Sequence, residues 1–143
     1  MQIKEINIFT NGDARKLSTW SNFPYFFTET LKEKGIKVNY VNIQPNKFLK
    51  NIYNFTIDKG LKKTKQHNAF DYYRTPINRF FANKIIQSAI KKFPNADANL
   101  FLNFSFSAKP YSNKPTILFG DWTYEHYFPH FKKRKPGKLE QTF

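Results

Sequence analysis

Hydrophobic and polar residues alternate in two segments near the N-terminus, over residues 3–9 and 36–43. Alternation with a period of two predicts β-strands. The first segment is followed by Asn11-Gly12-Asp13, a sequence that is typical of a turn. Each segment is therefore expected to be a strand, and the first is expected to end in a tight turn.

A helix is predicted between these two strands, over residues 20–34, because apolar residues recur there at helical spacing. Ser21 is the expected N-cap, and Pro24 lies in the first turn, where proline is tolerated. Gly35 stands where a glycine commonly ends a helix. A strand, a helix and a second strand form a βαβ unit, and such units build parallel sheets.

The rest of the pattern predicts two more helices and two more strands. Helices are expected over residues 45–61 and 70–93, and Pro76 marks a start or a kink in the second. Strands are expected over residues 98–104 and 115–120, and the first of these is apolar enough to be buried on both faces. The second helix is expected to pack through an apolar stripe that consists of Ile77, Phe80, Phe81, Ile85, Ile86, Ala89 and Ile90.

These elements predict an α/β fold, with a Rossmann-like parallel sheet and flanking helices, in a single domain over residues 1–143. The structural pattern fades after about residue 130, and doubly wound domains normally carry more strands. We therefore expect this domain to be incomplete.

Composition limits the class of protein. The chain contains 17 Phe and 40% hydrophobic residues, which is too much apolar bulk for a disordered chain. No apolar run approaches the roughly 18 residues that a membrane span needs. The N-terminus lacks the pattern of a signal peptide, so we expect a cytoplasmic protein. The absence of cysteine excludes disulfides, thiol catalysis and thiolate metal sites.

The net charge of +14 has two interpretations. A surplus of lysine suits a polyanionic partner, such as nucleic acid or an anionic membrane surface. Alternatively, Lys, Asn, Ile, Phe and Tyr are enriched together because their codons are rich in A and T. Nucleic acid is the less favoured partner, since it is read preferentially by arginine and this chain is dominated by lysine. Peripheral attachment of the lysine-rich helices within residues 45–93 to the inner face of a membrane is a further hypothesis.

Candidate ligand-binding residues follow from the expected sheet, because open α/β sheets bind ligands at the carboxyl ends of their strands. Gly12 lets a ligand approach the backbone, and the amides at the start of the helix after Ser21 can donate to an anion. Asp121 is a candidate base and His126 a candidate proton shuttle. The structural alternative for each is a turn, a cap or a partly buried residue. Several nearby aromatic residues either pack in the core or stack on a sugar ring, namely Trp20, Tyr25, Trp122, Tyr124 and Tyr127.

Metal and nucleotide-cofactor sites are not expected. His126 and His130 are four residues apart, but Pro129 argues against a helix that presents both to one metal ion. The chain has neither G-x-G-x-x-G nor a G-K-[ST] phosphate loop. No G-x-S-x-G elbow indicates a hydrolase triad.

The segment Ser18-Thr19-Trp20-Ser21-Asn22-Phe23-Pro24-Tyr25 resembles the (R/S)-T-W-S-G-x-P-Y stretch of bacterial glycosyltransferases with the GT-B fold, often labelled family 4 or group 1. The segment Asn11-Gly12-Asp13-Ala14-Arg15 resembles the polar loop before that stretch. The segment from Pro115 to Thr123 resembles a strand that these enzymes follow with an (S/T)-D-A-T-like turn. Asn22 stands where the family has glycine, and Trp122 where it has a small residue.

The resemblance implies an N-terminal, acceptor-side domain of an enzyme that transfers a sugar from a nucleotide-sugar to a glycan or lipid-linked acceptor, without a metal. It implies that the interdomain cleft is lined by Asn11, Gly12, Ser21, Asn22, Asp121 and Thr123, and Tyr25 joins them as an aromatic candidate. The family's donor-binding domain, with its Glu-x(7)-Glu motif, is not found in these 143 residues. The resemblance therefore implies a truncated chain that is inactive on its own.

Overall fold

The computed structural model describes residues 2–44, 47–53, 55, 75–120, 129–130 and 133. The chain divides into two compact units. The first unit comprises residues 1–44 and 83–120, and the second comprises residues 45–82 and 121–143. All the strands of the described part lie in the first unit.

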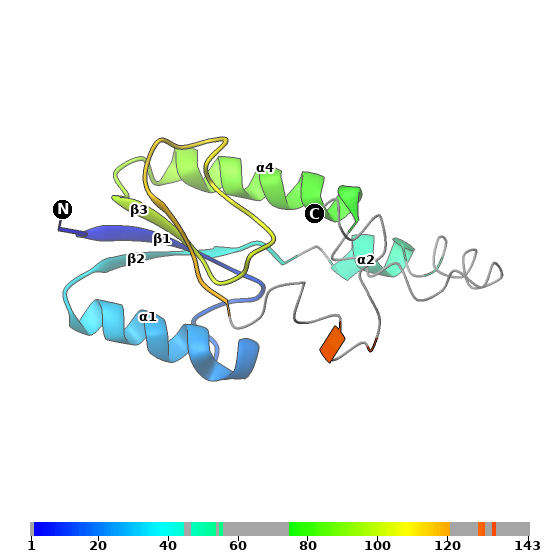
Figure 1. Cartoon of the computed structure of the whole chain (residues 1–143), viewed down its shortest axis with the longest axis horizontal. Helices are drawn as coiled ribbons and strands as arrows, with labels where there is room; N and C mark the ends of the chain where they lie inside the picture. The colour runs from blue at the N-terminus through cyan, green and yellow to red at the C-terminus, as the bar shows by residue number, and fades with distance from the viewer. Residues whose placement is uncertain are drawn as a thin grey trace. The chain divides into compact units, whose positions relative to one another are not determined.

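A sheet of four parallel strands forms the centre of the first unit (Figure 1). Its strands are β1 (Glu5–Thr10), β2 (Lys37–Asn42), β3 (Ala98–Phe101) and β4 (Thr116–Leu118). Their order across the sheet is β2-β1-β3-β4. The predicted α/β class and parallel sheet are therefore confirmed, although β3 and β4 are shorter than the sequence pattern indicated.

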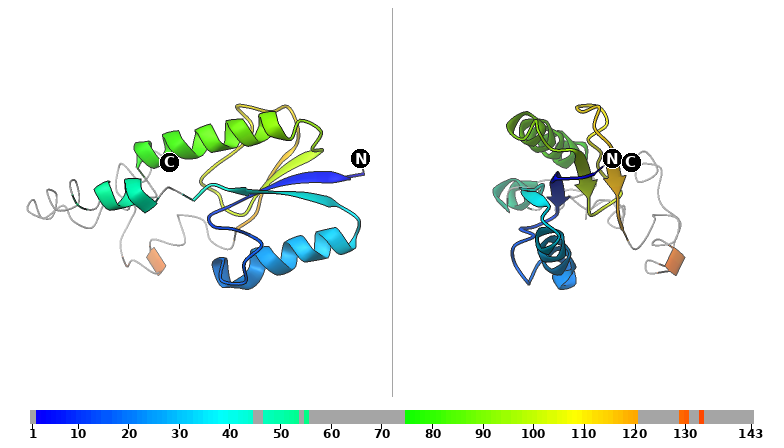
Figure 2. Two further views of the ribbon diagram at one scale, coloured as in Figure 1. Left: turned by 180° about the vertical axis from the view of Figure 1, so that it is seen from behind. Right: turned by 90° about the vertical axis from the view of Figure 1, so that its left-hand side faces the viewer.

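Helices cover both faces of this sheet (Figure 2). Helix α1 (Phe23–Glu33) packs against Ile6, Ile8 and Leu100 through Phe23, Phe27 and Leu31. On the other face, helix α4 (Pro76–Lys92) packs Ile86 and Ala89 against Phe9, Val41 and Phe101. The first unit is thus a sheet between two helical layers. Helix α2 (Lys47–Tyr53) belongs to the second unit.

The two ends of α1 compare differently with the sequence prediction. Its C-terminal end is confirmed, because Gly35 has a φ of +76° and its N–H donates to the Lys32 carbonyl at 2.9 Å. The N–H of Ile36 donates to the Leu31 carbonyl at 3.0 Å, which completes a Schellman motif. At the N-terminal end, the prediction that Ser21 is the N-cap is wrong. The N-cap is Asn22, which has left-handed backbone angles and makes no side-chain cap hydrogen bond.

Helix α4 begins at Pro76, where the sequence predicted either a start or a kink, and residues 70–74 lie outside the described residues. The predicted apolar stripe is only partly buried. Ile77, Phe80 and Phe81 are exposed, whereas the buried positions are Asn78, Ala82, Ile86 and Ala89. These buried positions follow one line along the helix at spacings of three or four residues, and the three exposed apolar residues lie off that line.

Three buried asparagines join neighbouring strands through their side chains. Asn39 on β2, Asn7 on β1 and Asn99 on β3 lie opposite one another in register. Nδ2 of Asn39 donates to Oδ1 of Asn7 at 3.0 Å, and Nδ2 of Asn7 donates to Oδ1 of Asn99 at 3.0 Å. A buried polar group without a partner costs roughly 1–3 kcal/mol. Each asparagine therefore needs its neighbour in this register, and we call the three residues the asparagine ladder.

Polar partners also satisfy the two ends of the asparagine ladder. Asn39 donates to Oε1 of Glu5 at 2.8 Å, and Lys37 pairs with the other oxygen of that carboxylate at 3.0 Å. These two contacts, with the Asn39 hydrogen bond as the larger effect, lower the pKa of Glu5 below its ordinary value. At the β3 end, Nδ2 of Asn99 lies 3.3 Å from Oγ of Ser112. The ladder therefore extends from a charged edge at β2 to the loop that precedes β4.

The asparagine ladder predicts a large effect of Asn7→Ala. This substitution leaves a buried oxygen on Asn99 without its donor and removes the acceptor of Asn39, so the free energy of unfolding is expected to fall by roughly 2–4 kcal/mol. Asn95→Ala, at an exposed asparagine before β3, is the matched control and is expected to stay within about 0.5 kcal/mol of the unchanged chain. Urea denaturation measures both. Equal stabilities of the two variants would contradict a structural role for the ladder.

Candidate functional site

The strand order reverses between β1 and β3. The chain leaves β1 through α1 on one face of the sheet and reaches β3 from α4 on the other, yet the two strands are neighbours. In open α/β sheets such a switch point is where ligands bind, beside the carboxyl ends of the strands. The candidate site is therefore framed by residues 11–22, after β1, and residues 102–115, after β3.

The loop after β1 is held in shape by hydrogen bonds. Asn42, at the end of β2, accepts from the backbone N–H of Gly12 at 2.9 Å. The hydroxyl of Thr10 donates to the Gly12 carbonyl at 2.6 Å, and the hydroxyl of Thr19 donates to the Asp13 carbonyl at 2.6 Å. Gly12 has a φ of +116°, and a Cβ atom there would lie 2.9 Å from the Thr19 side chain. The loop thus follows one tight path that only glycine permits at this position.

Asp13 is the only carboxylate in residues 11–22, and residues 102–115 contain none. Its two oxygens accept from Nε and a terminal nitrogen of Arg15 at 2.9 and 3.0 Å. The Arg15 side chain lowers the pKa of Asp13 below its ordinary value. An ionised carboxylate with a lowered pKa is a poor general base. These two loops are therefore better suited to binding than to proton transfer.

The turn before α1 is strained. Trp20, Ser21 and Asn22 all have positive φ angles, of 40°, 55° and 67°. Left-handed conformations of residues other than glycine cost roughly 1–3 kcal/mol each and persist only where surrounding contacts impose them. The side chains of all three residues are exposed. The strained turn therefore presents a hydroxyl, an amide and an indole ring to the surroundings.

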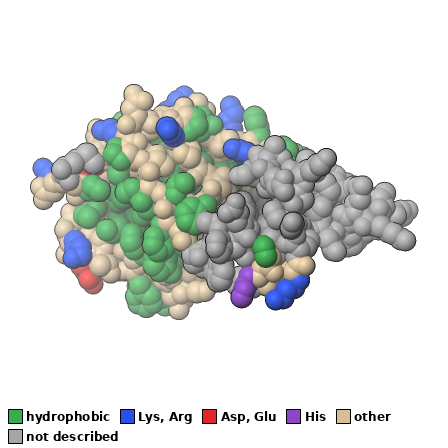
Figure 3. Space-filling view, in the orientation of Figure 1, with side chains coloured by type: hydrophobic (Ala, Val, Ile, Leu, Met, Phe, Trp, Pro, Cys, Tyr) green, Lys and Arg blue, Asp and Glu red, His purple; other side chains and the backbone are tan. Residues whose placement is uncertain are grey.

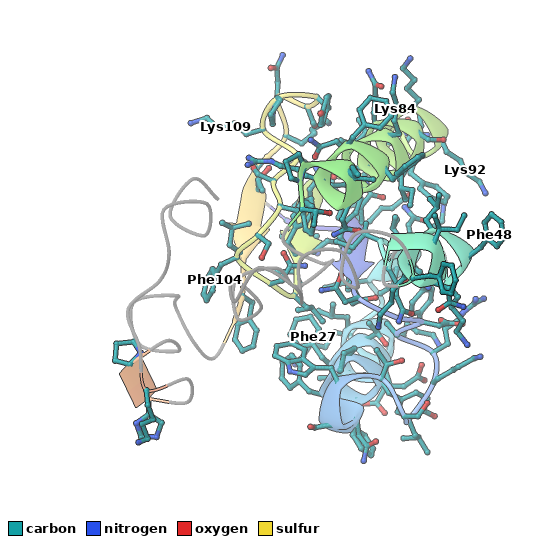
Figure 4. The ribbon with its side chains drawn as sticks, turned by 90° about the vertical axis from the view of Figure 1, so that its right-hand side faces the viewer. Phe27, Phe48, Lys84, Lys92, Phe104 and Lys109 are labelled. Atoms are coloured by element: carbon teal, nitrogen blue, oxygen red, sulfur yellow. The ribbon has the colours of Figure 1, made fainter. Side chains whose placement is uncertain are left out.

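Aromatic contacts connect this strained turn to the end of β4. Phe23 stacks on Phe119 with ring centroids 5.1 Å apart and an angle of 7° between planes. Trp20 meets Phe23 edge-on at 5.6 Å. Phe104, in the loop after β3, projects outward in Figure 4 and lies against Gly120, where a Cβ atom would be 2.5 Å from its ring. Trp20, Phe104 and Phe119 keep 37%, 42% and 45% of their surfaces exposed.

The side chain of Asn103 follows β3 and was not singled out in the sequence. Its Oδ1 accepts from the backbone N–H of Ser105 at 3.1 Å. Its Nδ2 is buried and has no hydrogen-bond partner in the part of the chain that the structure describes. An unpaired buried donor is costly, and this one lies at the switch point. The sequence pattern gave no signal for it, because Asn103 lies inside the strand expected over residues 98–104, whereas β3 ends at Phe101.

The structure places four of the predicted site residues at this edge of the sheet. Gly12 lies in the loop after β1, and Asn11, Ser21 and Asn22 have exposed side chains there. Tyr25 is half-buried on α1 and meets Phe26 edge-on at 5.4 Å. The remaining predicted residues lie outside the described residues, namely Asp121, Thr123 and His126. Among the described residues no group of three His, Cys, Asp or Glu is placed to hold a metal ion.

The amide, hydroxyl and aromatic groups of this edge suit a polar ligand. Asparagine amides both donate and accept hydrogen bonds, and serine hydroxyls do the same. Exposed aromatic rings add apolar surface for one face of a ring-shaped ligand. A ligand with many hydroxyl groups uses both kinds of contact.

Comparison with known proteins does not identify a family. No protein-family model matches the chain, and no curated protein or solved structure matches it. Within the described ranges, no helix is long and apolar enough to cross a membrane. The glycosyltransferase resemblance of residues 11–25 and 115–123 therefore stays a prediction.

The two left-handed glycines provide a test of the loop after β1. Gly12→Ala is expected to lower the free energy of unfolding by roughly 2–4 kcal/mol, because a strained φ combines with a clash against Thr19. Gly35→Ala is the matched control, since its Cβ would meet nothing within 4 Å, and its expected cost is about 1 kcal/mol. Thermal or urea unfolding measures the difference. A Gly12 variant as stable as the Gly35 variant would show that the loop is not tightly held.

Proposed function

We propose that this chain is the acceptor-side part of a sugar transferase and binds a hydroxyl-rich glycan, free or lipid-linked, at the carboxyl edge of its sheet. One observation carries the proposal. The loops at the switch point between β1 and β3 carry exposed amide and hydroxyl groups, exposed aromatic rings and, at Asn103, a buried amide nitrogen that has no hydrogen-bond partner among the described residues. Those are the groups that a sugar uses.

Each part of the edge has a role in this proposal. The Nδ2 group of Asn103 donates to a sugar oxygen and thereby satisfies a donor that is otherwise buried without a partner. Asn22 and Ser21 exchange hydrogen bonds with hydroxyl groups on the rim. The ring of Trp20 or Phe119 covers an apolar face of the sugar, since both are partly exposed.

The transfer reaction needs a nucleotide-sugar as the donor. In the proposed enzyme the donor is held by a second domain, as the resemblance of residues 11–25 and 115–123 implies. Asp121 and Thr123 are proposed to face the same cleft, and Asp121 and His126 are the candidates for proton transfer. The ion-paired Asp13 is not proposed as the base, because its pKa is lowered.

The proposal predicts that the whole chain binds neutral oligosaccharides in isothermal titration and binds nucleotide-sugars weakly or not at all. Asn103→Ala and Asn22→Ala are each expected to weaken oligosaccharide binding by roughly fivefold, the equivalent of about one hydrogen bond. Asn95→Ala removes the same type of side chain from the opposite end of β3 and is expected to leave affinity unchanged.

Three results would contradict the proposal. The first is a folded chain, judged by circular dichroism, that binds none of the oligosaccharides. The second is tight binding of nucleotide-sugars alone, which would mean that this chain carries its own donor site. The third is an equal loss of affinity in all three asparagine variants, which would place the ligand away from the switch point.

A further inference from the structure

The described part of the second unit exposes large apolar side chains along α2. Phe48 and Ile52 lie about one helical turn apart on α2, and Phe55 lies beyond the end of this helix at Tyr53. Their exposed fractions are 67%, 45% and 69%. Phe48 points away from α2 in Figure 4. These three side chains are therefore exposed on the surface.

A second exposed apolar group lies at the start of α4, also in the second unit. Ile77, Phe80 and Phe81 are 45%, 58% and 39% exposed. The rings of Phe80 and Phe81 meet edge-on at 5.5 Å. These are residues that the sequence pattern placed in the core, yet the helix buries Asn78 and Ala82 instead. Exposed apolar clusters on soluble proteins commonly mark interaction surfaces.

The charge of residues 45–82 indicates which kind of partner binds these exposed apolar residues. Residues 45–82 contain eight Lys or Arg and only two Asp. Lys47 on α2 and Arg79 on α4 are exposed beside the apolar residues. Helices that combine basic residues with Phe, Leu or Ile bind at the interface of anionic bilayers, where the apolar side chains insert and the cations contact lipid headgroups.

We infer that the second unit docks on an anionic lipid bilayer through the apolar residues Phe48, Ile52, Phe55, Ile77, Phe80 and Phe81, with the neighbouring cations at the headgroups. Docking places the helices at the surface of the bilayer, because α2 has only 7 residues and a span needs about 20. Nucleic acid would use the cations and the rings by phosphate contact and stacking, but it would leave Ile52 and Ile77 without a role.

Charge distinguishes residues 45–82 from exposed apolar residues of the first unit. In the first unit, Figure 3 shows hydrophobic side chains on the face toward the viewer. Exposed residues of that unit include Ile117, Leu118 and Phe119 at the edge strand β4 and in the residue after it. Residues 83–120 carry five Lys or Arg and one Asp, but β4 and Phe119 contain no charged residue at all. Apolar and basic side chains are therefore interleaved in residues 45–82 and not in β4.

The test is sedimentation of the whole chain with vesicles, either of phosphatidylcholine alone or with phosphatidylglycerol added. The chain is expected to pellet with the anionic vesicles, less with rising salt, and weakly with neutral ones. Replacing Phe48 and Phe80 together by serine is expected to lower the partition coefficient by roughly tenfold or more. Phe26→Ser is the matched control, because Phe26 is 60% exposed but lies on α1 in the first unit. Circular dichroism establishes that each variant is folded.

Several outcomes would overturn the inference. One is equal binding to neutral and anionic vesicles, and another is no binding to either. A third is an equal loss in the Phe26 variant, which would place the contact elsewhere. A fourth is salt-sensitive binding to single-stranded RNA in place of vesicles, which would identify the surface as a nucleic-acid site. None of these results bears on sugar binding by the first unit, so the two proposals fail separately.

Discussion

The hydrogen bonds among Asn39, Asn7 and Asn99 are the constraint on which the rest of the first unit depends. They cross three strands inside the sheet, where water is excluded, so a change of register would leave several amide groups buried without partners. A slip by one residue would also move every side chain of a strand to the opposite face. In the observed register Phe9 stacks on Phe101 at 4.3 Å with an angle of 5° between rings, directly beside the ladder.

Register in turn fixes where the strands end. The N–H of Leu102 donates to the Phe9 carbonyl at 3.0 Å, and the N–H of Phe119 donates to the Phe101 carbonyl at 2.8 Å. These two backbone hydrogen bonds extend the pairing of the strands to the point where the loops begin. Phe119 then lies where it can stack on Phe23, and that contact helps to hold the strained turn of residues 20–22 in place. A polar ladder in the core is connected in this way to the residues proposed to bind a sugar.

Features set by neighbouring residues could be predicted from the sequence. The βαβ order, a start or a kink at Pro76 and the glycine that ends α1 all depend on local patterns. The start of α1 could not be predicted from local sequence. Its N-cap, Asn22, makes no side-chain hydrogen bond, and the first residue of the helix, Phe23, stacks on Phe119, which is distant in the chain. The buried side of α4 was predicted from the positions of its apolar residues alone, whereas the residues that are buried include the polar Asn78.

The candidate site shows the same division. Gly12 and Ser21 could be named as candidates because they follow a recognisable strand and turn, and Asn22 was named from the glycosyltransferase resemblance. The role of the buried asparagines could not be predicted. The abundance of asparagine had a second explanation in codon composition, and the asparagines that bond to one another are 32 or 92 residues apart in the chain. Asn103 was hidden for a related reason. A buried amide without a partner is visible only when its surroundings are known.

The most direct test of this account is the NMR signal of the asparagine side-chain amides in the folded chain. Because the asparagine ladder is buried and hydrogen-bonded, the Nδ2 protons of Asn7 and Asn39 are expected to exchange slowly with solvent and to show nuclear Overhauser effects across the strands, from Asn39 to Asn7 and from Asn7 to Asn99. Rapid exchange of these protons, at the rate of an exposed asparagine such as Asn95, would contradict this account.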